Sequence, residues 1–147
     1  MTGFNEVITM FPSLQIVASQ SGDFTRSGGK TVMESFLSSM EPSTICAVWA
    51  HNDDMVIGAI EAIKEAGLDP SSDILTISVD AVPDIFKAMA DGDANATVEL
   101  SPEMGIQAYA AIKSHLAGET LPSLINVPGG MYFPDTAAEE YEARSGS

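Results

Sequence analysis

The sequence predicts an α/β fold built on a doubly wound parallel sheet of about five strands. Short apolar runs, typical of buried strands, alternate along the chain with segments whose apolar residues recur at helical spacing. Most of the apolar runs end abruptly in polar residues, as buried parallel strands do at their carboxyl ends. Strands that alternate with helices indicate right-handed crossovers, so we expect a single domain over residues 1–147.

The boundaries of the expected elements follow from the proline and glycine residues that interrupt this alternation. The opening helix ends before Pro12, the next helix ends before Pro42, and Pro83 begins another. Gly67 and Gly92 mark helix ends. Helices are expected at 4–11, 27–40, 53–66, 83–89, 103–116 and 135–144. Strands are expected at 14–18, 45–50, 74–79, 96–100 and 124–127.

Composition limits the range of functions. The 147 residues include 6 Lys and Arg against 21 Asp and Glu, for a formal net charge of −15. Nucleic acids and anionic membranes both need clustered cations, so neither is expected as a partner. No apolar run is long enough to span a membrane, and the first residues lack the basic and apolar regions of a signal peptide. The single cysteine, Cys46, is expected to be a buried structural residue.

Polar residues follow four of the expected strands. They are Asp23 to Arg26 after the first strand, and then Asn52, Asp80 and Glu99. Because the carboxyl ends of parallel strands lie at one edge of the sheet, these four positions should converge. Their convergence is what indicates a binding site. Each residue alone has an ordinary structural explanation, such as a helix cap for Asp80 or a surface cation for Arg26.

Together these side chains favour a sugar site. Phe24 offers a flat apolar surface for one face of a sugar ring, while Arg26 and Asn52 present planar groups that suit neighbouring hydroxyls. The carboxylates of Asp80 and Glu99 add acceptors for hydroxyl protons. This is chemistry for holding a polyol rather than for breaking bonds.

Catalytic interpretations are less well supported. His51 and His115 are the only histidines and fall on different elements, and no His/Cys spacing suits a metal. Asp53 and Asp54 could join His51 in a metal site or a small enzyme, but a pair that caps the following helix explains them better. The segment 26–30 lacks the spacing of a phosphate-binding loop. We therefore expect no catalytic residue, no metal and no cofactor.

Four motifs carry a family resemblance: SGDFTR at 21–26, AHNDDMVIGA at 50–59, DAVPD at 80–84 and ANATVELSP at 94–102. In combination they resemble the C-terminal half of periplasmic sugar-binding proteins of ABC transporters, the type I periplasmic binding proteins. The resemblance covers nearly all of the chain and is nearest to the galactofuranose-binding branch of the ribose-binding type. It implies a Rossmann-like lobe, a periplasmic location, an ABC permease as partner and no enzymatic activity.

The resemblance also implies which residues contact the sugar. In the family two similar lobes close over one sugar, and the second lobe supplies one wall of the site. The contacts carried over to this chain are Phe24, Arg26, Asn52 and Asp80, together with either Glu99 or Leu100 at the end of the next strand. The chain departs from many relatives next to Asp80, where Val79-Asp80-Ala81 stands in place of Gly-Phe-Asp or Ile-Asp-Gly.

A first lobe would precede this sequence in the family, so the resemblance implies that the chain begins part-way through a longer protein. Without the opposite wall of the cleft, sugar binding is expected to be much weaker. In the family the chain crosses to the first lobe near Pro102 and returns near Tyr132. Segment 103–130 would then lack its partner, and it is expected either to dock on the chain's own sheet or to form a homodimer.

Two other functions are compatible with the sequence. A stand-alone α/β dimerisation module would have no ligand and would use residues 103–130 as its interface. The effector domain of a sugar-responsive transcription repressor shares this fold, but a helix-turn-helix segment would precede it, and none is visible in the sequence. We expect sugar recognition in preference to both.

Overall fold

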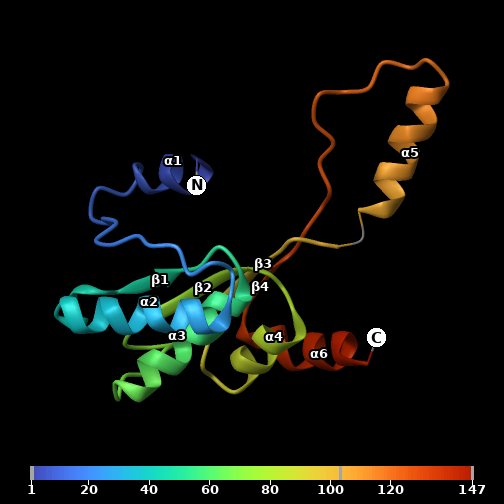
Figure 1. Ribbon diagram of the computed structural model, residues 1–147. Coiled ribbons are helices and arrows are strands. Elements are labelled where there is room, and N and C mark those ends of the chain that lie inside the picture. Colours follow the sequence, from blue (N-terminus) through green and yellow to red (C-terminus); the bar gives the residue numbers. More distant parts are fainter. Residues whose placement is uncertain (1, 103, 147) are drawn as a thin grey trace.

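The computed structural model describes residues 2–102 and 104–146. Its α-helices are α1 (Thr2–Ile8), α2 (Arg26–Ser39), α3 (Asp53–Glu65), α4 (Pro83–Ala90), α5 (Gly105–Leu116) and α6 (Pro134–Ser145), with a short 3-10 turn η1 at Pro42–Thr44 (Figure 1). Its strands are β1 (Ala47–Trp49), β2 (Leu75–Asp80), β3 (Ala96–Glu99) and β4 (Met131–Tyr132).

The strands form one sheet in the order β1-β2-β3-β4. β1, β2 and β3 are parallel, and the register places Asp80 opposite Glu99. β4 runs antiparallel to β3, with Met131 opposite Val98. The predicted α/β class is confirmed, and the carboxyl ends of β1, β2 and β3 share one edge. The sheet described has four strands rather than about five, and β4 makes it mostly rather than wholly parallel.

One face of the sheet carries most of the core. Figure 1 shows α2, α3, α4 and α6 together on that face, with α1 on the other side of the sheet. Helix α3 lies at the centre of this layer. One core cluster joins it to α2 through Met33 and Ile63, and the other joins it to α4 through Val56 and Phe86. The start of α3 is therefore held firmly behind the polar edge of the sheet.

Two of the expected strands are wrong, because residues 14–18 and 124–127 are not strands. Residues 14–18 lack a neighbour: among the described residues, the edge strand β1 pairs only with β2. A strand needs a partner for its backbone groups, however favourable its composition. The apolar side chains in this segment are exposed, namely Leu14, Ile16 and Val17.

The helix predictions hold to within a few residues, with two differences at the ends. The opening helix stops at Ile8 rather than near Phe11, and Glu103, the expected start of the helix now described from Gly105, lies outside the described residues. Cys46 is exposed rather than buried, because it precedes the edge strand β1. Within the described ranges no helix is long and apolar enough to cross a membrane.

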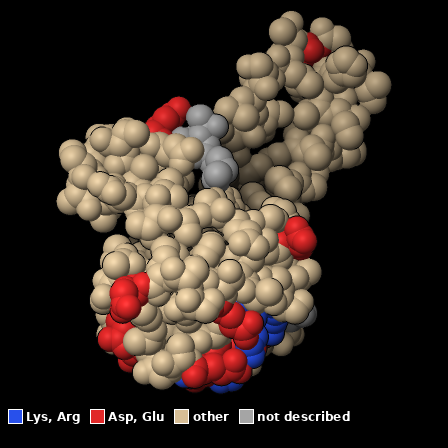
Figure 2. All heavy atoms as spheres, turned by 60° about the vertical axis from the view of Figure 1, so that its left-hand side comes forward, with Lys and Arg blue, Asp and Glu red and all other residues tan. Residues whose placement is uncertain are grey.

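Residues 100–102 and 104–130, here called the arm, project from the body of the molecule (Figure 1). Helix α5 buries none of its residues, and its large apolar side chains are between 57% and 80% exposed: Ile106, Tyr109, Ile112 and Leu116. The expectation that this segment docks on the chain's own sheet is therefore wrong. Figure 2 shows the arm almost free of charged side chains on the visible face, whereas acidic and basic side chains gather on the body.

The N-terminal parts of α2 and α3 touch backbone to backbone. A Cβ added at Gly58 of α3 would lie 1.9 Å from the carbonyl oxygen of Arg26 at the start of α2. No side chain fits at that distance, so the two helices can approach this closely only at glycine. The contact brings the loop before α2 next to the start of α3.

Gly58→Ala should lower the free energy of unfolding by about 2 kcal/mol or more, because the added methyl group forces α2 and α3 apart. Gly105→Ala is the matched control: a Cβ there meets nothing within 4 Å, so stability should be unchanged or slightly higher. Urea unfolding followed by circular dichroism measures both variants. Equal stability of the two variants would contradict this description of the contact.

Candidate functional site

Asn52 caps α3 and also holds the loop before α2. Its Oδ1 accepts a hydrogen bond from the Met55 backbone N–H at 3.0 Å, and its Nδ2 donates to the carbonyl oxygen of Phe24 at 3.2 Å. The expectation that Asp53 or Asp54 caps this helix is wrong, since both lie in its first turn. An amide suits this position because it can accept with one atom and donate with the other.

Asp53 is the buried carboxylate behind the site. It accepts hydrogen bonds from the hydroxyls of Ser78 on β2 and Thr97 on β3, and from the Val82 backbone N–H at 2.8 Å. Burial raises the pKa of Asp53, although these hydrogen bonds and one from the Ala81 backbone N–H favour its charged form. One side chain therefore ties the start of α3 to two strands and to the turn after β2.

Asp80 ends β2 in a strained turn. Its φ is 123° and that of Ala81 is 66°, both in the region that favours glycine. Desolvation raises the pKa of Asp80, and the negative charges of Asp53 and Asp54 raise it further. Strain of this kind persists only where the surroundings hold it, and it is frequent at ligand sites.

The Arg26 guanidinium bridges the beginnings of three helices. Its Nε donates to Asp54 of α3 at 2.7 Å, and its Nη2 donates to Asp84 of α4. The hydrogen bond to Asp54, followed by that to Asp84, raises the pKa of Arg26. All three side chains are about half exposed, so the ion pairs add little stability. Their main effect is to fix the direction of the guanidinium.

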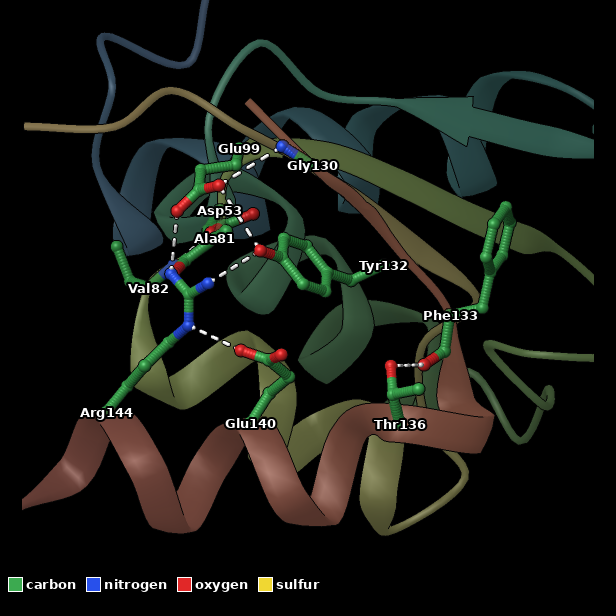
Figure 3. Close-up of polar contacts among 10 residues, drawn as sticks. All are labelled: Asp53, Ala81, Val82, Glu99, Gly130, Tyr132, Phe133, Thr136, Glu140 and Arg144. Atoms are coloured by element: carbon green, nitrogen blue, oxygen red, sulfur yellow. Dashed lines mark hydrogen bonds and ion pairs between the residues drawn. The ribbon is translucent and has the colours of Figure 1, made fainter. Parts of the chain in front are cut away.

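The Glu99 carboxylate is engaged on both oxygens (Figure 3). Oε1 accepts from Arg144 Nη1 at 3.1 Å, while Oε2 accepts from the Gly130 backbone N–H at 3.1 Å and from the Tyr132 hydroxyl at 3.2 Å. Desolvation alone would raise the pKa of Glu99, but the hydrogen bonds from Gly130 and Arg144 outweigh it, so the pKa is lowered.

Four of the five predicted site residues are linked around the N-terminal end of α3: Phe24, Arg26, Asn52 and Asp80. Glu99 lies beside Asp80 in the sheet but turns its carboxylate to Arg144, while Leu100, its alternative, is 59% exposed. Phe24 is 67% exposed. An open groove of about 560 Å³ runs between α3 and α4, and among these residues only Arg26 lines it.

Sequence comparison places the chain in a family. The profile of the periplasmic binding protein domain matches residues 1–120. The chain belongs to the periplasmic binding protein family. Galactofuranose-binding protein YtfQ of Escherichia coli (strain K12) is 55% identical over 144 residues, which are 97% of this chain and 45% of that protein. Ribose import binding protein RbsB of Bacillus subtilis (strain 168) is 39% identical over 128 residues, which are 86% of this chain and 39% of that protein.

Solved structures of periplasmic binding proteins give the same result. The binding component of the arabinose ABC transporter from Shewanella sp. ANA-3, bound to α- and β-L-arabinofuranose, has a TM-score of 0.90 at 56% identity, covering 97% of this chain and 48% of that one. A galactofuranose binding protein has a TM-score of 0.88 at 55% identity, covering 98% and 49%. The chain thus spans about half the length of the periplasmic binding proteins it matches.

The three residues that could have formed a metal site, His51, Asp53 and Asp54, have different surroundings in the structure. Asp53 is enclosed by its hydrogen bonds, Asp54 pairs with Arg26, and His51 is exposed. Within 2–102 and 104–146, no group of three or more His, Cys, Asp or Glu side chains could hold a metal ion.

The sequence analysis missed the partners of the site residues. Asp84 pairs with Arg26 across 58 positions, and Arg144 pairs with Glu99 across 45. Asp84 is an ordinary acidic residue in the first turn of a helix, so it gives no local signal of that pair. Arg144 gives a weak one, because it is one of only six lysines and arginines in a strongly acidic chain.

Glu99→Gln should lower stability most at neutral pH. Because folding lowers the pKa of Glu99, its charged form stabilises the fold above pH 4.5, and that contribution is lost as the pH falls through the lower folded-state pKa. The difference in unfolding free energy between wild type and Glu99→Gln should therefore shrink below pH 4.5. Urea titrations across this range measure it, and a difference independent of pH would contradict the assignment.

Proposed function

We propose that this chain is the sugar-recognising C-terminal lobe of an ABC-transporter solute-binding protein, with a pentose or hexose in its furanose form as ligand. The proposal rests on a fixed guanidinium, an amide and a carboxylate near the N-terminal end of α3, with the backbone of Phe24 hydrogen-bonded to the same amide. Relatives at 55% and 56% identity are a galactofuranose-binding protein and a protein bound to arabinofuranose. Galactofuranose is therefore the first ligand to test.

Each side chain has a distinct role in this proposal. The exposed Phe24 ring stacks on the apolar face of the sugar. Arg26 donates to hydroxyl oxygens from a direction fixed by its two carboxylate partners. Asn52 keeps one Nδ2 proton and one oxygen lone pair beyond its bonds within the protein. Asp80 accepts hydroxyl protons, and the fifth contact comes from Glu99 or Leu100.

The open edge of the sheet supports weak binding by this chain alone. The candidate residues cover a sugar from one side, so water competes for every hydrogen bond on the other. In a longer protein of this family, a first lobe would supply the second wall and would pack on residues 103–130. That whole protein would bind its sugar in the periplasm, pass it to an ABC permease and carry out no chemistry on it.

Asp80→Asn should abolish sugar binding without unfolding the chain, because it keeps the shape of the side chain and removes the charge that accepts hydroxyl protons. The measurement is a titration of the 147-residue chain with methyl β-D-galactofuranoside and with L-arabinose, followed by amide NMR shifts. In the wild type, shifts should concentrate at Phe24, Asn52 and Asp80, with a Kd of about 1 mM.

Asp135→Asn is the matched control for this titration, since Asp135 is exposed at the start of α6 and lies outside the candidate site. It should bind sugar as the wild type does. Two results would contradict the proposal: shifts confined to the groove between α3 and α4, or an Asp80→Asn variant that binds as well as its control.

The exposed apolar stripe on α5 favours one alternative, a homodimer through residues 103–130 without a ligand. Apolar side chains this exposed usually find another surface. We expect the chain to self-associate with rising concentration, and Ile112→Glu to keep it monomeric while Asp80→Asn leaves association unchanged. Light scattering coupled to size-exclusion chromatography measures this, and a wild-type chain that stays monomeric at high concentration would exclude the dimer.

A further inference from the structure

Glu99 and Gly130 form a joint at the base of the arm. The chain leaves the body at Leu100 and returns at Gly130. The Glu99 backbone N–H donates to the Gly130 carbonyl oxygen at 2.8 Å, and the Gly130 N–H donates to the Glu99 carboxylate at 3.1 Å. A Cβ at Gly129 would lie 2.5 Å from the Glu99 carbonyl oxygen, so only glycine permits this approach. The outgoing segment at Leu100 and the returning segment at Gly130 should therefore move together.

Arg144 of α6 holds this joint to the body (Figure 3). Its Nη1 donates to Glu99 at 3.1 Å, its Nη2 to the Tyr132 hydroxyl at 2.8 Å, and its Nε to Glu140 at 2.9 Å. The guanidinium carbon lies 4.9 Å from the centroid of the Phe86 ring and 5.0 Å from that of Tyr132. A guanidinium that lies against two rings and donates to several oxygens has little freedom to reorient.

The same joint holds the strained turn that carries Asp80. The Leu100 backbone N–H donates to the Asp80 carbonyl oxygen at 3.3 Å, and Arg144 Nη1 donates to the Ala81 carbonyl oxygen at 3.4 Å. Both carbonyls belong to the residues with positive φ. The other side of the turn is held by the buried Asp53. The position of Asp80 therefore depends on groups at the base of the arm.

We propose that Arg144 is a positioning residue that couples the direction of the arm to the position of Asp80. A partner that docks on α5 and turns the arm would move Leu100 and Gly130 against the body. Leu100 and Arg144 would pass this movement to the two carbonyls of the turn. Coupling between two sites is reciprocal, so a ligand held at Asp80 would in turn fix the arm. The consequence for sugar affinity rests on the proposed function.

Hydrogen exchange in the sugar-free chain tests the coupling. In Arg144→Met, the backbone amides of Ala81 and Val82 should exchange at least about ten-fold faster than in the wild type. Arg144→Lys keeps the positive charge but loses the planar set of guanidinium donors, so exchange at these amides should be accelerated to an intermediate degree. Lys87→Met, which removes a cation paired with Asp91 on the surface, is the matched control and should leave these amides unchanged. Unchanged exchange at Ala81 and Val82 in Arg144→Met would overturn the proposal.

Glu99→Gln covers the case in which Arg144→Met does not fold. This variant keeps the volume of the side chain and weakens the joint without altering the turn itself. Coupling predicts faster exchange at Ala81 and Val82 as well as at Gly130. Acceleration confined to Gly130 would mean that the joint loosens without moving the turn, and it would overturn the proposal.

Sugar titration separates this inference from the proposed function. With methyl β-D-galactofuranoside as the probe, Arg144→Met should raise Kd about ten-fold, Arg144→Lys less, and Lys87→Met not at all. Unchanged affinity in Arg144→Met, despite faster exchange, would overturn the link to the ligand. A wild-type chain that binds no sugar would count against the proposed function, while the exchange measurement would still decide the coupling.

Discussion

The carboxylate of Asp53 is the constraint on which the rest of the site depends. A charged group out of contact with water must be satisfied by fixed donors, and here these come from β2, β3 and the turn after β2. Asp53 is the first residue of α3, so the donors also fix where that helix begins. Asn52 and Asp54 flank Asp53 in the sequence, so the position of Asp53 sets theirs.

The two arginine networks are similar in composition but differ in what they permit. Arg26 meets its carboxylates at the surface, where an ion pair is worth only about 0–1 kcal/mol. Replacing one of those contacts by a hydroxyl group of a ligand therefore costs little. Arg144 meets Glu99 beside two aromatic rings, where a lost hydrogen bond would leave a charge partly desolvated. The exposed network of Arg26 can therefore exchange partners, whereas the more buried network of Arg144 is rigid.

Local patterns in the sequence predict those parts of the fold that local forces determine. Helical spacing of apolar residues, with the prolines and glycines that interrupt it, predicted the α-helices to within a few residues. The polar residues after β1, β2 and β3 placed Asn52, Asp80 and Glu99 at one edge of the sheet. Strand formation depends on a neighbour as well as on composition, which is why residues 14–18 were misassigned. The ion pairs of Arg26 and Arg144 join residues far apart in sequence, and spacing carries no information about such pairs.

The joint between Glu99 and Gly130 has a consequence for the modularity of this chain. β3 and β4 are antiparallel neighbours, and the backbone groups of Glu99 and Gly130 continue their pairing by one more position. In connectivity the arm is thus the loop of a β-hairpin that has grown into a separate structural part. The pairing of β3 with β4 does not depend on the length or content of that loop, so the sheet and the arm are separate modules joined at Glu99 and Gly130.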